Sequence, residues 1–248
     1  ADAEQIRNLY YGGVSMADAM IGVVLDELEA RGVLDDTIVV VTSDHGEELG
    51  DHDLWEHNFM FETNLRIPLL VRYPRQIPAG TRVAAAVDSI DLLPTLCDLL
   101  ELEVPRDEAL GARGVVDGAS LLPLVRGESA RLRPFTFAEN GLFLSINDGR
   151  FKLIVRRAVL EEGGFEKALA GDIARPELYD LVSDPGEQRN VFESETERAR
   201  ALYASLGEWS RSLPIPEYHF ERSARDFEDE HLLEVLGYGG GVGEKEDE

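Results

Sequence analysis

Residues 37–62 join a short run of β-branched side chains directly to a dense group of acids and histidines, T-I-V-V-V-T-S-D-H-G-E-E-L-G-D-H-D-L-W-E-H-N-F-M-F-E. The apolar run from Ile38 to Val41 is continuous and bounded by polar residues, which predicts a strand covered on both faces. In open α/β sheets, ligands bind in the crevice beyond the carboxyl ends of such strands. The segment therefore predicts an α/β fold with a binding site just after Val41.

The residues that follow this strand have the chemistry of a metal site. Asp44 and His45 come at its end, and Gly46 gives the backbone freedom to turn sharply after them. A carboxylate and an imidazole are natural ligands of a divalent cation. His52 and His57 follow within the same segment, together with further acids (Glu47, Glu48, Asp51 and Asp53). A polar loop that merely contains histidines is the alternative, but the preceding strand favours a site.

Composition limits the classes of function. A chain of 248 residues with 44% hydrophobic content can bury a sizeable core, and we expect one large domain and a smaller one. The net charge of −25 argues against nucleic acid as a partner and against adhesion to anionic membranes. No apolar run is long enough for a transmembrane segment. A single cysteine excludes an internal disulfide framework.

We expect residues 1–133 to form one part of an α/β domain. Periodicity predicts helices over 2–31 and 88–100, and apolar runs predict strands over 37–42 and 67–73. Residues 102–133 lack sustained periodicity and are expected to connect two domains over the surface. Trp55 lies within the site segment and is a candidate pocket wall.

The pattern then changes to short strands separated by turn residues. We expect a small domain over 134–215, with strands at 135–138, 142–147, 150–156 and 177–181 and a closing helix at 193–213. Asp148-Gly149 between two of these strands is a strong hairpin signal. Tyr179 is expected to pack against the main domain. Residues 216–248 read as an acidic, partly disordered tail with a short helix at 227–236.

Several blocks of the sequence occur in the order found in one enzyme family. They are Tyr10-Tyr11 with Val14-Ser15 and Asp18, the T-S-D-H-G-E-E-L-G-D-H segment, R-I-P-L-L-V-R-Y-P from Arg66, V-D-S-I-D-L-L-P-T-L from Val87, D-G-A-S-L-L-P-L-V-R-G from Asp117, D-G-R-F-K-L-I from Asp148, E-L-Y-D-L-V-S-D-P-G-E-Q-R-N-V from Glu177, and L-G-Y-G-G from Leu236. Together they resemble the carboxyl-terminal part of a sulfatase, in the alkaline phosphatase superfamily. The resemblance implies an alkaline phosphatase-like α/β sandwich, here a partial central sheet with flanking helices. A smaller carboxyl-terminal α+β subdomain with an antiparallel sheet follows it.

The resemblance also implies an activity. Sulfatases hydrolyse sulfate monoesters, and the substrate here would be a small-molecule or glycan sulfate ester. In the family, a hydrated formylglycine attacks sulfur, the alcohol leaves and the covalent sulfate is then eliminated. One divalent cation, usually Ca²⁺ and sometimes Mg²⁺, withdraws charge from the sulfate oxygens.

Family roles can be carried over to three positions of this chain. The family holds its cation with two acids near the amino terminus and a later Asp-Asn or Asp-His pair, which matches Asp44 and His45. A basic residue further on contacts the sulfate, and its position matches His57, where most relatives have lysine. His57 is therefore the candidate catalytic and substrate-binding residue, able to donate a hydrogen bond or protonate the leaving alkoxide. For His52, a place in the substrate pocket and a purely structural role both stay open.

The family's nucleophile motif is absent from these 248 residues. Formylglycine is made from Cys or Ser in C-x-P-S-R or a closely related motif, and no such motif occurs here. Cys97 lies in the leucine stripe of a predicted helix, where a small buried thiol is expected. The resemblance therefore implies that the nucleophile and the remaining metal ligands lie upstream of this chain.

Two alternatives remain open from the sequence. A phosphonate or phosphate ester hydrolase or a phosphoethanolamine transferase shares the Asp-His pair on the same fold, and fold does not settle function. A threonine nucleophile would indicate phosphoryl transfer, whereas C-x-P-S-R would indicate a sulfatase. The other alternative is that the chain is a catalytically incomplete fragment, because it begins without Met or a signal-peptide pattern.

Overall fold

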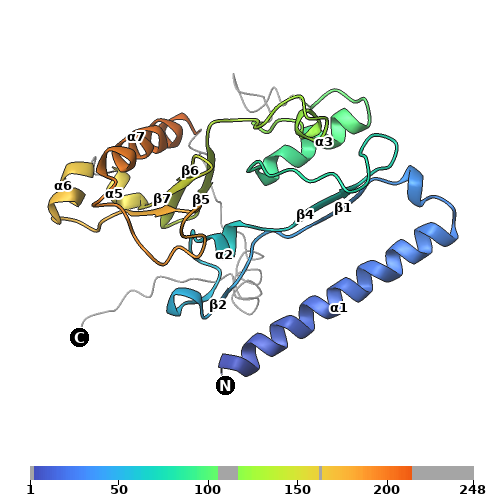
Figure 1. Cartoon of the computed structure of the whole chain (residues 1–248), viewed down its shortest axis with the longest axis horizontal. Helices are drawn as coiled ribbons and strands as arrows, with labels where there is room; N and C mark the ends of the chain where they lie inside the picture. Colours follow the sequence, from blue (N-terminus) through green and yellow to red (C-terminus); the bar gives the residue numbers. More distant parts are fainter. Residues whose placement is uncertain (1–2, 106–116, 162–163, 214–248) are drawn as a thin grey trace, which may run out of the picture. The chain divides into compact units, whose positions relative to one another are not determined.

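Two larger elements organise the part of the chain described here, a long amino-terminal helix and a four-stranded sheet (Figure 1). The computed structural model describes residues 3–105, 117–161 and 164–213. Residues 1–210 group into one unit and residues 211–248 into a second. The expected tail at 216–248, with its helix at 227–236, lies outside the described residues. No helix among the described residues is long and apolar enough to cross a membrane.

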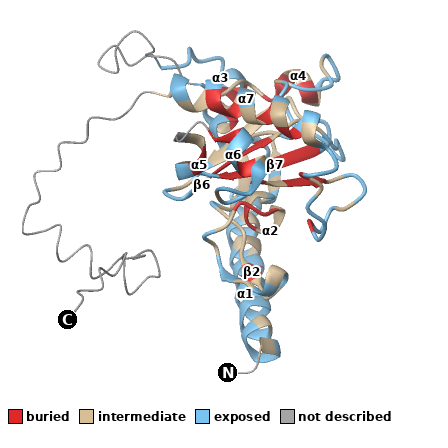
Figure 2. Ribbon diagram, turned by 90° about the vertical axis from the view of Figure 1, so that its left-hand side faces the viewer, coloured by how far each residue is buried: buried red, intermediate tan, exposed pale blue. Residues whose placement is uncertain are grey.

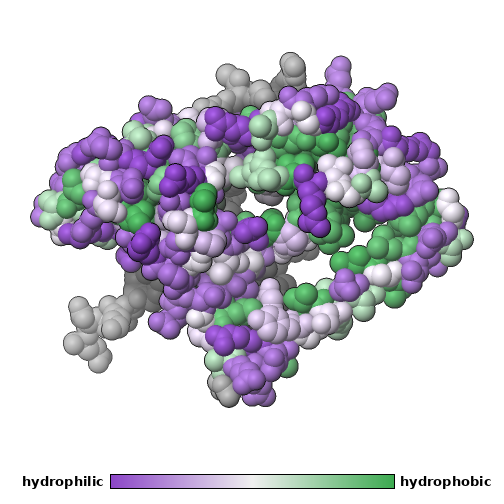
Figure 3. Space-filling model, viewed as in Figure 1, coloured by the Kyte–Doolittle hydropathy of each residue, from purple (hydrophilic) through white to green (hydrophobic). Residues whose placement is uncertain are grey.

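Helix α1 (Ala3–Ala30) confirms the helix expected over residues 2–31. It ends where Gly32 takes a positive φ of 70°, which a glycine adopts without steric cost. No side chain of α1 is buried against the other described residues. Apolar side chains, among them Met20 and Val24, therefore remain on its surface (Figure 3).

The strand expected over residues 37–42 is present as β1 (Val39–Thr42), but it is not covered on both faces. It pairs antiparallel with β4 (Leu69–Arg72), with Val40 opposite Val71, and these two strands form a sheet of their own. Val39 to Val41 are half-buried and Thr42 is exposed. The expectation of burial on both faces was therefore wrong for the described residues, which leave β1 half-buried and paired only with β4.

A four-stranded antiparallel meander forms the second half of the described chain, as the sequence predicted. Its strands are β5 (Thr136–Glu139), β6 (Phe143–Asn147), β7 (Phe151–Arg156) and β8 (Glu177–Asp180), in that order across the sheet. The predicted hairpin turn joins β6 to β7. Asn147 Oδ1 accepts a hydrogen bond from the Gly149 N–H, and Asp148 Oδ1 accepts from the N–H groups of Arg150 and Phe151. Gly149 has a φ of 93° there.

One face of this sheet forms the main hydrophobic core. Helices α5 (Arg157–Glu161), α6 (Phe165–Ala170) and α7 (Thr196–Ser212) cover that face. Leu153 and Leu178 lie opposite each other in the sheet and are completely buried. Figure 2 shows the buried residues gathered in the sheet and its covering helices. The closing helix expected over 193–213 is α7.

The opposite face of the sheet packs against the segment that follows the candidate site. Ile154 and Tyr179 form a buried cluster with Met60 and Phe61, and the rings of Phe61 and Tyr179 meet edge to face with centroids 6.0 Å apart. The expected packing of Tyr179 against the main part of the chain is therefore confirmed. Burial on both faces explains why β7 has a nearly continuous run of buried residues.

A buried lysine links the sheet to helix α2 (Glu62–Leu65). Lys152, on the same face as Tyr179, is 1% exposed and its Nζ donates a hydrogen bond to Glu62 Oε1 over 3.0 Å. The same Nζ lies 2.6 Å from Glu187 Oε1, an ion-pair contact without hydrogen-bond geometry. Glu187 Oε2 accepts from the Glu62 N–H over 2.6 Å. The three residues tie the start of α2 to β7.

The helix expected over residues 88–100 divides into a 3-10 turn (Ser89–Asp91) and helix α3 (Leu92–Leu99). Cys97 is buried on α3, which agrees with the packing role expected of it.

Residues 102–133 were expected to run over the surface, and this is wrong at helix α4 (Leu122–Val125), where Leu122 is fully buried with Leu99 and Tyr73. Arg133 pairs with Asp88 and with the buried Asp91. The proposed domain boundary at 133/134 stays a prediction.

Replacing Lys152 with alanine should strongly destabilise the fold, because it leaves the buried Glu187 carboxylate without its cation. Losing one partner of a buried ion pair costs about 3–5 kcal/mol, which we expect as the fall in the free energy of unfolding. Lys167→Ala is the matched control, since Lys167 is exposed on α6. Urea unfolding of both variants measures the difference. Equal unfolding free energies would show that the Lys152 contacts do not stabilise the fold.

Candidate metal and anion site

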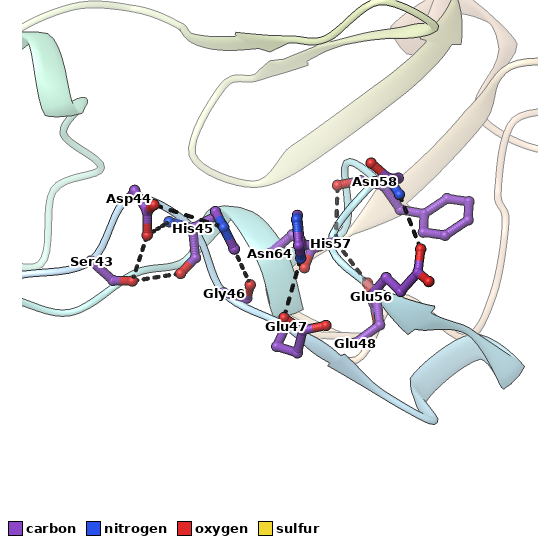
Figure 4. A network of polar contacts seen from close by, with 11 residues as sticks. Ser43, Asp44, His45, Gly46, Glu47, Glu48, Glu56, His57, Asn58 and Asn64 are labelled. Atoms are coloured by element: carbon purple, nitrogen blue, oxygen red, sulfur yellow. Dashed lines mark hydrogen bonds and ion pairs between the residues drawn. The ribbon is translucent and has the colours of Figure 1, made fainter. Parts of the chain in front are cut away.

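The site begins where β1 ends. The Ser43 hydroxyl donates to the His45 carbonyl over 2.6 Å, and Asp44 Oδ1 accepts from the His45 N–H over 3.0 Å (Figure 4). His45 Nδ1 lies 2.6 Å from the carbonyl oxygen of Gly46. These short-range bonds hold the Asp44 and His45 side chains beside each other, with Asp44 Oδ2 3.8 Å from His45 Nε2.

Gly46 is needed for space rather than for an unusual backbone angle. Its N–H donates to the Asn64 carbonyl over 2.8 Å, so the loop runs against α2. A Cβ built on Gly46 would lie 1.9 Å from the Thr63 carbonyl oxygen. The sequence-based reason, a sharp turn, is therefore replaced by a close approach of two backbone segments.

A short hairpin brings His57 back over the loop. Strands β2 (Glu48–Leu49) and β3 (Trp55–Glu56) are antiparallel, with Glu48 opposite Glu56 and Leu49 opposite Trp55. The next pair in this register is Glu47 and His57. His57 Nδ1 accordingly lies 3.3 Å from Glu47 Oε2 (Figure 4).

His45 joins this pair to make a group of three. The rings of His45 and His57 are stacked, with centroids 4.1 Å apart and planes 22° from parallel. One ligand atom from each of His45, Glu47 and His57 lies within 4.8 Å of the other two. All three side chains are partly buried, with exposed fractions of 32%, 23% and 23%. The structure thus brings together two predicted site residues and Glu47, which had no assigned role.

Asp44 lies on the other side of His45 and faces solvent. Its side chain is 76% exposed, and it is not part of the three-residue group. Hydrogen bonds from the backbone N–H of His45 and from its own N–H lower the pKa of the Asp44 carboxyl, as does the nearby His45 ring. Asp44 is therefore held as a carboxylate, the form that binds a cation.

His52 is placed apart from the other two histidines of the segment. Its ring stacks on Phe61 with centroids 3.9 Å apart and planes 9° from parallel. Its backbone has a φ of 55°, which is uncommon outside glycine. The stacking supports a role in holding the loop, and the assignment of His52 to the substrate pocket stays a prediction.

Trp55 lies at the rim of the hairpin and is 36% exposed. Helix α1 contacts the hairpin here, because Arg7 Nε donates to the Leu49 carbonyl over 2.6 Å and the Arg7 guanidinium lies 5.7 Å from the Trp55 ring centroid. This stacking gives Trp55 a structural partner on one face. Its role as a pocket wall stays a prediction.

Glu48 anchors the hairpin from beneath. Its side chain is fully buried, and its Oε1 accepts hydrogen bonds from the Thr63 hydroxyl and from Asn64 Nδ2. Neither Glu48 Oε2 nor Asn64 Oδ1 has a hydrogen-bond partner among the described residues. Burial raises the pKa of the Glu48 carboxyl, although the Thr63 hydrogen bond opposes this.

A pattern in the sequence could have found Glu47. In an extended chain, residues two apart point to the same side, so His45 and Glu47 share a face. The burial of Glu48 follows from the same alternation, which turns it inward. The pairing of Glu47 with His57 needs the hairpin register, which the sequence does not mark with a tight Asn-Gly type turn.

The residues at the end of β1 fit a divalent cation. Asp44 offers a carboxylate oxygen and His45 a ring nitrogen, and two ligands of one ion at about 2.0–2.4 Å lie roughly 3–4 Å apart. The observed 3.8 Å is within that range. The Gly46 carbonyl oxygen accepts a hydrogen bond from His45 Nδ1–H, which leaves Nε2 as the coordinating nitrogen.

Comparison with known proteins identifies the family. The family model for sulfatases matches residues 1–102. Over 190 residues, the chain is 33% identical to the N-acetylglucosamine-6-O-sulfatase of Bacteroides thetaiotaomicron, a match that covers 76% of this chain and 32% of that protein. The chain belongs to the sulfatase family. The resemblance drawn from the sequence blocks is confirmed.

Other relatives agree. Arylsulfatase K of Xenopus laevis is 30% identical over 207 residues, which are 83% of this chain and 37% of that protein. The sulfatase-family chain spans about a third of the length of these curated relatives.

Solved structures share the fold. One, a protein in complex with its substrate D-glucosamine-2-N,6-O-disulfate, aligns with a TM-score of 0.62 at 31% identity over 80% of this chain and 39% of that chain. The phosphonate monoester hydrolase of Agrobacterium radiobacter aligns with a TM-score of 0.64 at 27% identity over 85% of this chain and 41% of that chain. This sulfatase-family chain thus has the alkaline phosphatase-like fold, here mixed α/β with antiparallel sheets.

Glu48→Gln should stabilise the hairpin at neutral pH. The amide can keep the bonds to Thr63 and Asn64 Nδ2, and it removes the cost of a negative charge at a fully buried position. Because the folded-state pKa of Glu48 is raised, its contribution is full below the ordinary value of 4.5 and is lost as pH rises through the folded-state pKa. The stability of the variant relative to the wild type should therefore increase as pH rises from 4 to 7.

Thermal unfolding midpoints at several pH values measure this difference. Glu56→Gln is the control, because Glu56 lies opposite Glu48 but is exposed. Glu48→Ala should instead cost about 1–3 kcal/mol, since it leaves the buried Asn64 amide and the partly buried Thr63 hydroxyl without their acceptor. A Glu48→Gln variant that loses stability with rising pH as steeply as the wild type would contradict the raised pKa.

Proposed function

We propose that this chain is the carboxyl-terminal part of a metal-dependent sulfatase that hydrolyses a sulfate monoester. The observation that supports the proposal is the grouping at the end of β1. Asp44 and His45 lie side by side there, and His57 stacks on His45. A carboxylate and an imidazole for a cation, next to a second imidazole for an anion, are what hydrolysis of a sulfate ester needs.

Each residue of the grouping has a separate task in the proposal. Asp44 and His45 hold the cation, which would be Ca²⁺ or Mg²⁺ by family precedent. When bound, such a cation withdraws charge from the sulfate oxygens and lets a nucleophile approach an anionic centre. His57 contacts the sulfate and protonates the leaving alkoxide. His52, whose ring stacks on Phe61, is a further candidate substrate contact.

His57 is positioned for this role by Glu47. The carboxylate lies 3.3 Å from His57 Nδ1 and can accept a hydrogen bond from it, which orients the ring. We therefore assign Glu47 as a residue that positions His57.

The nucleophile lies outside these 248 residues in the proposal. No C-x-P-S-R motif occurs in the chain, and Cys97 is buried on α3. A formylglycine and two further acidic ligands would come from a preceding segment of the same protein. The substrate is a small-molecule or glycan sulfate ester, a class suggested by the sulfated glucosamine bound to the related structure.

Hydrolysis of a phosphonate or phosphate ester is the second candidate. This candidate is supported by the structural similarity to phosphonate monoester hydrolases of Agrobacterium radiobacter and Silicibacter pomeroyi. Their TM-scores are 0.64 and 0.65. An aryl sulfate and an aryl phosphonate, assayed side by side with the full-length protein, separate the two. Preference for the phosphonate would replace the sulfatase proposal.

The 248-residue chain alone should not turn over an aryl sulfate, since it contains no formylglycine motif. Release of the phenol, followed by absorbance with and without added Ca²⁺, measures this. Metal-dependent release by the purified chain would mean that its own residues suffice for catalysis and that the proposed division of the site is wrong.

In the full-length protein, Asp44→Ala should lower activity at least about 100-fold, because a lost metal ligand removes several kcal/mol of charge stabilisation. Asp53→Ala is the control, since Asp53 is an exposed acid of the same loop outside the three-residue group. Rates for both variants are measured over a range of Ca²⁺ concentrations. Activity of Asp44→Ala equal to that of Asp53→Ala would show that the ligand is misassigned.

A further inference from the structure

Two sets of possible ligands meet at His45. On one side lies Asp44, with its Oδ2 3.8 Å from His45 Nε2. On the other side lie Glu47 and His57, which form a group with His45 whose ligand atoms are all within 4.8 Å of one another. Asp44 does not belong to that group. The imidazole of His45 can therefore serve either set.

The three-residue set differs in chemistry from the Asp44 pair. It offers two ring nitrogens and one carboxylate oxygen, and His₂Glu is a ligand set found at zinc sites. Imidazole suits Zn²⁺ and other transition cations, whereas Ca²⁺ takes six to eight oxygen ligands. The donors on this side of His45 therefore select for a different class of cation.

The spacing of the donors agrees with a single tetrahedral ion. Two ligands at about 2.1 Å from such an ion are roughly 3.4 Å apart. Glu47 Oε2 and His57 Nδ1 lie 3.3 Å apart. Because the His45 and His57 rings are stacked, a cation held by both turns one ring out of the stack.

The surroundings prepare the site for a cation. The bond from His45 Nδ1 to the Gly46 carbonyl fixes the ring and leaves Nε2 to coordinate. The hairpin register sets Glu47 opposite His57 before any ion binds. The side chains are 23–32% exposed, so a fourth position stays open to solvent or to an anion. The net charge of −25 raises the local concentration of cations.

We propose that His45, Glu47 and His57 form a three-ligand site that binds a Zn²⁺-class transition cation without using Asp44. The inference rests on the proposed function only in sharing His45 with it. When this site is filled, His45 and His57 are both withdrawn from the roles given to them above. A transition cation would thus compete with the Ca²⁺ or Mg²⁺ arrangement at one imidazole.

Calorimetric titration of the purified 248-residue chain with Zn²⁺, and separately with Ca²⁺, tests the site. The wild type should bind Zn²⁺ at least about 100-fold more tightly than Ca²⁺. Glu47→Gln and His57→Gln should each weaken Zn²⁺ binding by more than about 100-fold, because even outer-shell partners cost about 10- to 100-fold. Asp44→Asn should leave Zn²⁺ binding unchanged.

Matched controls exclude other sources of zinc binding. Glu56→Gln changes an exposed acid of the same hairpin, and His52→Gln changes a histidine whose ring stacks on Phe61. Neither should alter Zn²⁺ affinity. His219 and His231, which lie outside the described residues, are the remaining histidines of the chain. Zinc bound by them would not respond to Glu47→Gln or His57→Gln. Thermal unfolding without metal checks that each variant is folded.

Three results would overturn the proposal. The first is that the wild type does not bind Zn²⁺. The second is that the Glu47→Gln and His57→Gln variants bind Zn²⁺ as tightly as the wild type. The third is that Asp44→Asn loses Zn²⁺ binding while those two variants retain it. None of them bears on sulfate hydrolysis, since no substrate is present. Conversely, an inactive or phosphonate-specific full-length protein would remove the proposed function and leave the zinc titration to be judged by itself.

Discussion

The contact between the site segment and the four-stranded sheet is the interaction on which the described structure depends. Met60 and Phe61 pack on Ile154 and Tyr179, while Lys152 reaches from the same face of the sheet to Glu62 and Glu187. The apolar part of this contact removes large side chains from water, at roughly 1.5–3 kcal/mol each. The ion pairs fix how the two segments are placed, because a buried ammonium needs its carboxylates in fixed positions. Together they fix the end of the site loop only a few residues after His57.

The site itself is built by two short-range constraints. Hydrogen bonds among residues 43–46 hold Asp44 and His45 at the end of β1, and the close approach of Gly46 to Thr63 sets the path of the loop. The two-residue strands β2 and β3 then decide, through their register, which side chains return to the loop. The result is one imidazole between two ligand sets of different chemistry. In the two proposals made above, the cation that is bound would decide whether His57 contacts an anion or a metal.

Much of this could be predicted from residue patterns, and the failures have physical reasons. The meander and its Asp148-Gly149 turn were predicted because alternation and turn residues act locally. Burial of β1 on both faces was predicted but is not observed, because burial depends on what covers a strand and not on the strand's own residues. A buried Lys152 carries no signal in a sequence, since lysine is ordinarily exposed and its partner Glu187 is distant along the chain. Leu122, within a segment lacking periodicity, is buried for the same non-local reason.

The sequence by itself determined that Asp44 and His45 follow a strand, that the chain has a mixed α/β composition of elements, and that its motifs are those of sulfatases. These follow from neighbours in the chain and from motif order. Only the tertiary structure decided that His57 meets His45, that Glu47 is the third member of the group and that His52 turns away to Phe61. A hairpin register one residue out would have reversed these faces, because side chains alternate along a strand. In the folded chain, the buried Glu48 carboxylate is held by Thr63 and Asn64, contacts between distant residues that the sequence alone does not reveal.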